Sequence, residues 1–191
     1  MEDKAISMLQ TILKRRGQES EKKQYTTDVQ RVNAYVLGTT LVFASQKDKL
    51  TERDILPLIE ELEKSGLKSL VILSKSPASQ NVLKAIRANA SKVQFYHIQE
   101  LQMDITTHRM YMPHYIYNEK FIAENPLVAK AYEAAKIKSP KDELPRIDSQ
   151  DIVVRLIGAV PGDIVYIRRH SDTSGYSHYW RQVVEDANLT E

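Results

Sequence analysis

The stretch ELPRIDSQDIVVRLIGAVPGDIVYIRRHSDTSG, residues 143–175, gathers acids, arginines and glycines in a short span. Its segment QDIVVRLI predicts a short helix that Ser149 caps and Gly158 ends, because Ser favours the N-cap and Gly the position after a helix. The sequences DIVYIRR and SHYWRQVV flank the turn HSDTSG and predict a β-hairpin. The pattern indicates a compact α+β unit over residues 144–191. Its charge density raises the question of whether this unit is a catalytic centre.

The N-terminal part of the chain, residues 1–103, predicts an α/β layer. Apolar residues at helical spacing alternate with short runs of β-branched and aromatic residues. The expected helices are 1–16, 51–65 and 76–90, and the expected strands are NAYVL, TLVFASQ, LKSLVIL and KVQFYHI. The polar segment 17–30 is expected to be a loop. This order of elements indicates strands joined by crossing helices.

Residues 104–143 form a predicted connecting segment between the two parts. Asn118 is a favoured N-cap for a helix that continues through Ala135. Pro126 lies inside that helical pattern and predicts a kink or a split, because proline removes a backbone donor. The proline-punctuated sequence IKSPKDELPRI then leads into the C-terminal unit.

The composition excludes several classes of function. The 191 residues include 27 Lys+Arg and 25 Asp+Glu, so the chain is not a polycation that coats nucleic acid by charge alone. It has no cysteine, which excludes disulfides, thiol nucleophiles and cysteine-based zinc sites. Charges interrupt the N-terminal apolar stripe, which therefore predicts neither a signal peptide nor a membrane span. We expect a soluble intracellular protein with no membrane partner.

The sequence offers no catalytic motif. The glycines of the opening stretch lack the Gly-Lys-Ser/Thr of a phosphate loop, and no GxSxG nucleophile elbow occurs. Two-metal hydrolysis needs converging carboxylates, but the strands LKSLVIL and KVQFYHI carry none. The histidines, none of which has the spacing of a metal-ligand pair, are His97, His108, His114, His170 and His178. We therefore predict no catalytic residue, no metal and no cofactor.

The loop SKSPAS, residues 74–79, is a candidate phosphate contact. It follows an apolar strand and precedes a helix N-terminus, whose free N–H groups favour an anion. Lys75 and the hydroxyls of Ser74, Ser76 and Ser79 can reach a nucleic-acid backbone. The alternative is a plain helix start, with Ser76 as the N-cap and Pro77 near the first helical position. The local sequence leaves both interpretations open.

From LPRIDSQDIVVRLIG onward the sequence resembles the assembly domain of the fifth common subunit of eukaryotic nuclear RNA polymerases, a family that also has archaeal members. That family reads L-P-R-I, D-P-x-x-R-x-x-G, a glycine, a Val-rich strand, an arginine, S-E-T-A-G and a strand ending in an aromatic–Arg pair. Without a gap from Leu144 to Val183, the matching residues are Leu144, Pro145, Arg146, Ile147, Asp151, Arg155, Gly158, Gly162, Arg169, Ser171, Thr173, Gly175 and Arg181. More weakly, residues 103–116 resemble the family's I-N-I-T-x-H-x-L-V-P-x-H.

The resemblance implies a non-catalytic structural subunit of a multisubunit DNA-directed RNA polymerase. Residues 1–103 would form a jaw domain with a nuclease-like fold beside downstream double-stranded DNA. The family's assembly region would begin near residue 106 and dock on the largest subunit within the polymerase core. The DNA-proximal residues implied are Lys75, Ser76, Pro77 and Ser79. No homo-oligomer is expected.

The expected subunit interface rests on charged residues of the C-terminal unit. Arginine is favoured where bidentate contacts cross an interface. The candidates are Arg146, Asp151, Arg155, Arg169 and Arg181. The alternative is that these arginines form internal ion pairs with Asp148, Asp151 or Asp172. A small core of Ile147, Val153, Ile157, Ile164 and Val165 is expected beneath them.

Departures from the family pattern bear on origin. Ile152 replaces the proline after Asp151, Ser174 replaces an alanine, and Trp180 stands where tyrosine is usual. The helical region 118–138 is longer than the family's, and the tail EDANLTE runs past the usual end. These differences favour a homologue encoded by a large DNA virus, located in host cytoplasm and virion, over a nuclear cellular subunit. The alternative function is a stand-alone DNA-binding or nuclease-like protein that reuses the module.

Overall fold

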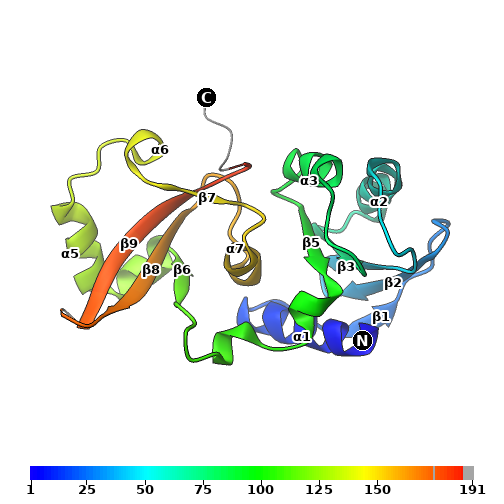
Figure 1. Ribbon diagram of the computed structural model, residues 1–191, viewed down its shortest axis with the longest axis horizontal. Coiled ribbons are helices and arrows are strands. Elements are labelled where there is room, and N and C mark those ends of the chain that lie inside the picture. Colours follow the sequence, from blue (N-terminus) through cyan, green and yellow to red (C-terminus); the bar gives the residue numbers. More distant parts are fainter. Residues whose placement is uncertain (174, 187–191) are drawn as a thin grey trace. The chain divides into compact units, whose positions relative to one another are not determined.

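The computed structural model describes residues 1–173 and 175–186 (Figure 1). The chain divides into a first unit, Met1–Asp104, and a second unit that begins at Ile105. Ser174 and most of the predicted tail, residues 187–191, lie outside the described residues. Each unit has its own sheet, so the chain is a mixed α/β protein with two sheets, as the sequence predicts at that level.

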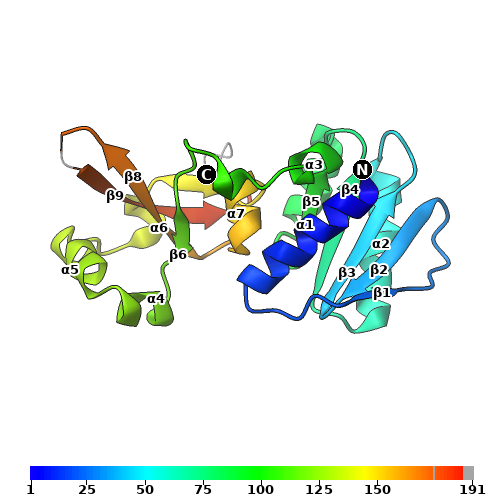
Figure 2. The same cartoon turned by 90° about the horizontal axis from the view of Figure 1, so that it is seen from below.

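The first unit is a five-stranded sheet between helices. The strand order is β1(Lys22–Gln24), β2(Val32–Leu37), β3(Thr40–Ser45), β4(Ser69–Ser74) and β5(Val93–His97). β3, β4 and β5 are parallel, whereas β2 is antiparallel to both of its neighbours. One face is covered by α1(Glu2–Arg15) and the other by α2(Glu52–Ser65) and α3(Gln80–Arg87) (Figure 1, Figure 2). This layering follows from β3 and β4, whose apolar runs must be covered on both faces.

The first core, between this sheet and the helices α2 and α3, consists of almost fully buried apolar side chains. Its members are Ala34, Leu41, Phe43, Leu50, Ile55, Leu58, Leu62, Leu70, Ile72, Val82, Ile86, Val93 and Phe95. On the other face, α1 buries Ala5, Ile6, Leu9, Ile12 and Leu13. The helical spacing of apolar residues in the sequence therefore identified the inward faces of α1 and α2 correctly.

The limits of α2 confirm the prediction from its end residues. Thr51 is the N-cap, and its backbone N–H donates to the Asp54 carboxylate at 2.9 Å. Gly66 ends the helix with φ of 66°, a left-handed conformation that glycine adopts without steric cost.

Two expectations for the first unit are wrong. Part of the predicted loop 17–30 forms β1, whose three residues are all exposed at the sheet edge. An edge strand without an apolar face has no periodic signal, so only its pairing with β2 reveals it. The second error concerns α3, which begins at Gln80 with Ser79 as its N-cap; the Ser79 hydroxyl accepts a hydrogen bond from Val82 N–H at 3.5 Å. The Ser76 hydroxyl donates to the Asp48 carbonyl instead of capping the helix, which therefore starts later than predicted.

The second unit begins with irregular turns. It contains a four-stranded sheet of order β6-β8-β9-β7. Its 3₁₀ turn is η2(Ile105–Thr107), after η1(Ile98–Leu101) of the first unit. Its strands are β6(His114–Ile116), β7(Arg146–Asp148), β8(Ile164–Ser171) and β9(Gly175–Val184), and its helices are α4(Glu119–Glu124), α5(Pro126–Ala134), α6(Pro140–Glu143) and α7(Ile152–Ile157). The predicted hairpin is confirmed as β8 and β9, which pair antiparallel from Ile164–Gln182 to Ser171–Gly175.

The helical region after β6 also follows the prediction. Asn118 caps α4, its Oδ1 accepting a hydrogen bond from Phe121 N–H at 3.0 Å. Pro126 occupies the first turn of α5, so the expected helix is split into two.

The start of α7 differs from the prediction. Asp151 is the N-cap, and its Oδ1 accepts from Val153 N–H at 2.8 Å and Val154 N–H at 3.3 Å. Ser149, the predicted cap, is buried and donates to the Glu185 carbonyl at 3.1 Å. Gly158 ends the helix as predicted, with φ of 78°. Asp151 rather than Ser149 is the cap because the Ser149 hydroxyl is hydrogen-bonded to Glu185, which is distant in sequence.

The second core is also partly different from the expected one. It consists of Val154, Ala159, Val165, Ile167 and Val183, with Ile116, Ile147 and Ile157 partly buried against it. Val165, Ile147 and Ile157 were expected, but Val153 and Ile164 are not members. The later start of α7 directs Val154 rather than Val153 inward, and Ile164 lies on the opposite face of β8 from Val165.

Candidate functional site

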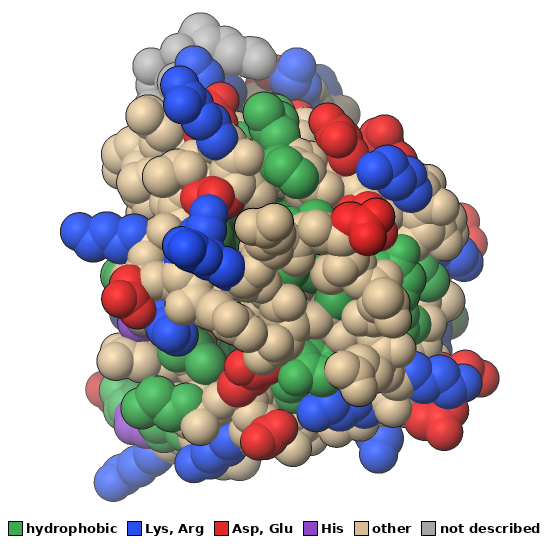
Figure 3. Space-filling view, turned by 90° about the vertical axis from the view of Figure 1, so that its right-hand side faces the viewer, with side chains coloured by type: hydrophobic (Ala, Val, Ile, Leu, Met, Phe, Trp, Pro, Cys, Tyr) green, Lys and Arg blue, Asp and Glu red, His purple; other side chains and the backbone are tan. Residues whose placement is uncertain are grey.

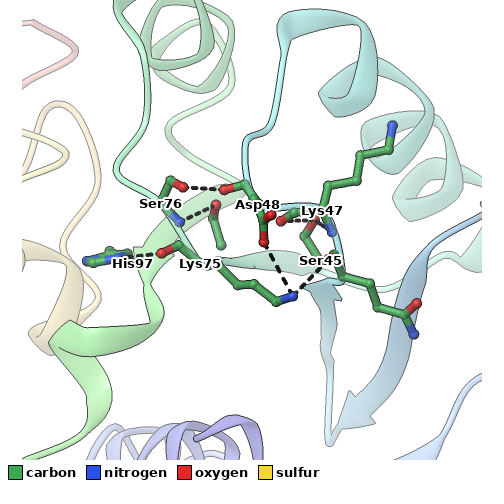
Figure 4. Close-up of polar contacts among 8 residues, drawn as sticks. Ser45, Lys47, Asp48, Lys75, Ser76 and His97 are labelled. Atoms are coloured by element: carbon green, nitrogen blue, oxygen red, sulfur yellow. Dashed lines mark hydrogen bonds and ion pairs between the residues drawn. The ribbon is translucent and has the colours of Figure 1, made fainter.

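The loop that the sequence singled out lies at the carboxyl edge of the first sheet. Its three parallel strands end there at Ser45, Ser74 and His97. The loop 75–79 leaves β4, and the loop 46–51 leaves β3 beside it (Figure 4). Carboxyl ends of adjacent parallel strands are a common place for binding sites in α/β folds, because the loops that follow meet there.

Lys75 and Ser76 are tied to the neighbouring loop. The Lys75 ammonium donates to the Gln46 carbonyl at 2.9 Å and lies 3.7 Å from the Asp48 carboxylate. The Ser76 hydroxyl donates to the Asp48 carbonyl (Figure 4). Both side chains that were predicted to face a phosphate therefore hold two loops together, and an external anion would have to compete for them.

The same loop is fixed from its other side by His97, which the sequence did not suggest, and by Ser74, one of the predicted phosphate contacts. The ring Nε2 of His97 donates to the Lys75 carbonyl at 2.8 Å, and Ser76 N–H donates to the Ser74 hydroxyl at 3.2 Å. The role of His97 could have been suspected only from its place at the end of a strand next to the loop.

The remaining predicted residues of the loop are open to solvent. Pro77 and Ser79 are exposed, and Ser79 caps α3. The helix cap belongs to Ser79 rather than Ser76, and the phosphate contact stays a prediction. The Ser79 hydroxyl accepts a hydrogen bond from the backbone of α3, whereas Lys75 and Pro77 are exposed at the surface.

Charges around the loop are mixed in sign. Lys47 donates to the Asp54 carboxylate. Burial by itself would raise the pKa of Asp54, but the hydrogen bonds from Lys47 and Thr51 outweigh it and lower the pKa below its usual value. The loop's own neighbours are also of both signs, since Lys75 lies 3.7 Å from the Asp48 carboxylate. Lys and Arg side chains are likewise interspersed with Asp and Glu on the face of the molecule drawn in Figure 3. A contact with nucleic acid here would be local, made by the loop rather than by a broad basic surface.

The five interface candidates of the second unit do not form one cluster. Asp151 caps α7, and Arg155 is only 6% exposed, with its Nε donating to the Gln150 carbonyl at 2.9 Å. These two residues hold the turn before α7 and its first residues together. Their match to the family motif therefore has a local structural explanation.

The other three candidates lie on two faces of the second sheet. Arg181 is opposite Val165 in the β8–β9 ladder, and Arg169 is four residues beyond Val165, so both lie on the core face, the face that carries the second core. Arg146 is opposite Gln182 and lies on the other face. Arg169 and Arg181 are exposed, and an Arg181 Nη1 donates to the Arg146 carbonyl at 3.3 Å.

The other face of the sheet carries an aromatic cluster that the sequence analysis missed. α4 and α5 contribute Phe121 and Tyr132, whose rings lie 5.5 Å from Tyr166 and 5.4 Å from Trp180. The complete aromatic cluster is Tyr115, Tyr117, Phe121, Tyr132, Tyr166, His178 and Trp180. We call this the aromatic face. The helices α4 and α5 thus pack on the second sheet.

Candidate metal or membrane sites find no support among residues 1–173 and 175–186. No group of three or more His, Asp or Glu side chains in that range could hold a metal ion. His114 is bound to the Met112 carbonyl through Nδ1 at 2.6 Å, and burial lowers its pKa. No helix in the same range is long and apolar enough to cross a membrane.

Comparison with known proteins covers the second unit most strongly. Residues 103–183 match the family described as RNA polymerase Rpb5, C-terminal domain. The chain is 39% identical over 85 residues to the DNA-directed RNA polymerase subunit Rpo5 of Thermococcus onnurineus, covering 44% of this chain and 94% of that protein. It is 51% identical over 45 residues to Rpo5 of Methanosarcina mazei, covering 24% of this chain and 58% of that protein.

A third relative spans both units. The subunit RPABC1 of DNA-directed RNA polymerases I, II and III from Caenorhabditis briggsae is 26% identical over 170 residues, which cover 86% of this chain and 77% of that protein. These relatives are all named as subunits of DNA-directed RNA polymerases. Within that class, the chain belongs to the Rpb5 family, as the resemblance at residues 144–183 predicts.

Proposed function

We propose that this chain is a structural, non-catalytic subunit of a multisubunit DNA-directed RNA polymerase. The observation that carries the proposal is the match of residues 103–183 to the Rpb5 C-terminal domain. Catalysis would belong to the large subunits, since the carboxylates that two-metal chemistry requires are missing from β4 and β5. The chain's contribution is then architectural.

The second unit would dock on the largest subunit through its core face. That face presents Arg169 and Arg181 beside Tyr179, whose side chain is 45% exposed. Arginine and tyrosine are enriched in interface centres because each combines a large contact area with hydrogen bonding. The small second core supports the same proposal, because a unit with so few buried side chains gains much from burial against a partner.

The first unit would form the jaw, with a nuclease-like layer arrangement, on one side of downstream double-stranded DNA. The contact would use Pro77, Ser79 and Lys75, which are exposed at the carboxyl edge of the sheet. Ser76 would take part only after its hydroxyl leaves the Asp48 carbonyl. The jaw boundary near residue 103 and the assembly region from about 106 are part of this proposal.

A charge-reversal test addresses the jaw. Lys75→Glu with Ser76→Asp places negative charge at the loop and should shorten the lifetime of promoter open complexes at about 0.15 M salt, because the screening length there is still about 8 Å. The matched control is Lys4→Glu with Ser7→Asp, the same change on exposed residues of α1. Recovery of the subunit with polymerase should be normal in both variants. Equal lifetimes in the two variants would remove the DNA contact and leave the subunit assignment intact.

The subunit assignment is tested by the stoichiometry of a tagged copy purified from its native setting. We expect equimolar recovery with the two largest polymerase subunits, measured by quantitative mass spectrometry. Recovery alone or in trace amounts would favour the alternative, a stand-alone DNA-binding or nuclease-like protein. The identity of the co-purifying large subunits would also decide between a viral and a cellular origin, and with it between host cytoplasm and nucleus.

A further inference from the structure

The end of the β8–β9 hairpin gathers cations around an exposed ring on the aromatic face. By register, His170 lies opposite Tyr176 and Arg168 opposite His178, which places these four residues on one face. The Arg168 guanidinium lies 4.8 Å from the centre of the Tyr176 ring, and the His170 ring meets the same ring edge-on at 5.8 Å. Arginine over an aromatic face is a favourable cation–π arrangement that holds both groups in place.

This arrangement is open to solvent. The Tyr176 side chain is 54% exposed, and Arg168, His170 and His178 are exposed as well. The aromatic cluster lies further along the same face, where the buried Tyr166 shares a hydrogen bond of 2.7 Å with the exposed His178. The exposed ring therefore lies on the same face of the sheet as a cluster of packed aromatic side chains.

The charge of the hairpin is one-sided. Residues 164–184 contain three arginines and two histidines but a single carboxylate, that of Asp172, in a chain whose overall charge is only +2. Asp172 lies 3.6 Å from His170 through its carboxylate and the ring Nδ1. Arg168 and Arg169 remain as adjacent cations on opposite faces, a local excess that suits an anionic ligand.

We propose that Arg168, His170 and Tyr176 bind single-stranded nucleic acid, with a base stacked on the Tyr176 ring and the adjacent phosphate held by Arg168. An exposed ring flanked by cations is how proteins bind single strands without reading sequence. A duplex keeps its bases stacked inside, so it cannot use the ring in this way. This site lies on the opposite face from the proposed docking residues Arg169 and Arg181 and does not depend on them.

The test uses the full-length chain and a fluorescein-labelled oligothymidylate of about 15 nucleotides, a length within the usual site size. Binding is measured by fluorescence anisotropy at about 50 mM and about 150 mM salt, since phosphate contacts weaken with salt. We expect Tyr176→Ser to raise the dissociation constant at least about fivefold, as loss of one stacked base does. Arg168→Ala should also lower the salt dependence, by a slope of about 0.7 for one lost phosphate.

Two controls keep the outcome specific. Tyr179→Ser removes a ring that is 45% exposed from the core face, and Lys120→Ala with Lys130→Ala removes two exposed cations from α4 and α5. Both should change the dissociation constant by less than about twofold, because neither removes a stacking contact. Cross-linking with ultraviolet light should place the oligonucleotide on peptides from residues 164–184.

Several results would overturn the proposal. These are the absence of binding at low salt, equal weakening by Tyr179→Ser, and duplex DNA competing as well as the single strand. Undiminished oligonucleotide binding by Tyr176→Ser, together with loss of recovery with polymerase, would assign the surface to a protein partner instead. The far-ultraviolet circular dichroism spectrum of each variant should match that of the parent, because the substituted side chains are exposed.

Discussion

The two units of the chain are stabilised in different ways. The first unit has thirteen side chains in an apolar core on one face of its sheet, and α1 covers the other face of that sheet. The second has a core of five side chains on one face of its sheet and an aromatic cluster on the other. Yet the match to the Rpb5 C-terminal domain covers residues 103–183, almost all of them in the second unit. A large core accepts many apolar sequences of similar volume, whereas a small unit depends on particular caps, turns and partner contacts.

The largest effect that would test this contrast is expected from Phe43→Ala. Phe43 is fully buried in the first core, and removing a buried phenylalanine costs about 3–5 kcal/mol. Trp180, the one tryptophan of the chain, lies in the second unit, so its fluorescence reports that unit while circular dichroism reports both. In urea, the dichroism midpoint should fall while the Trp180 midpoint stays.

The control for this experiment is Leu56→Ala, which truncates a side chain of α2 that is 52% exposed. It should change the unfolding free energy by less than about 0.5 kcal/mol. If the Trp180 midpoint falls together with the dichroism midpoint in Phe43→Ala, the two units unfold as one and the contrast between them fails.

A smaller loss of stability, in the second unit instead of the first, is expected from Asp151→Ala. It leaves two backbone N–H groups at the start of α7 without their acceptor, and loss of such a cap costs about 1 kcal/mol. Here the Trp180 midpoint should move and the first unit should not. Asp151→Asn keeps the side-chain acceptor and should retain most of the stability; an equal loss in both variants would mean that charge rather than capping matters.

The smallest effect concerns acid sensitivity of the first unit. The pKa of Asp54 is lowered in the folded state, so its contribution is fully present above the ordinary value of 3.8 and is lost as the pH falls through the lower folded value. Asp54→Asn should cost about 0.5–1 kcal/mol at neutral pH. The difference from the parent should disappear below the folded pKa, as urea titrations at several pH values would show.

The control is Glu63→Gln, which removes an exposed carboxylate from the same helix. It should leave the pH dependence of the first unit close to that of the parent. A difference between Asp54→Asn and the parent that persists at low pH would mean that the amide disturbs α2 for another reason.

Much of the fold was predictable from local patterns. Apolar spacing identified the strands β2 to β5 and the inward faces of α1 and α2, and Asn118, Pro126 and Gly158 marked helix limits correctly. These features depend on residues near in sequence, so the local chain carries the signal. The family could be identified for the same reason, since its motif is a set of turn and cap residues at fixed spacing.

The errors share a cause. Ser76 and Ser149 were predicted as N-caps because serine favours that position, but each hydroxyl donates to the carbonyl of a residue remote in sequence, Asp48 and Glu185. β1 exists only because β2 offers it a partner. Competition between a local and a distant hydrogen-bond partner cannot be judged from the local sequence.

The sequence by itself determined most helices and strands of the first unit, the β8–β9 hairpin, the lack of cysteine and the membership of the Rpb5 family. Tertiary structure alone decided which serines and acids cap helices, which loop Lys75 holds, and how the arginines divide between the two faces of the second sheet. The reason is geometric. Helical and strand periods are set within a few residues, whereas facing partners and free surfaces exist only once strands distant in sequence have paired.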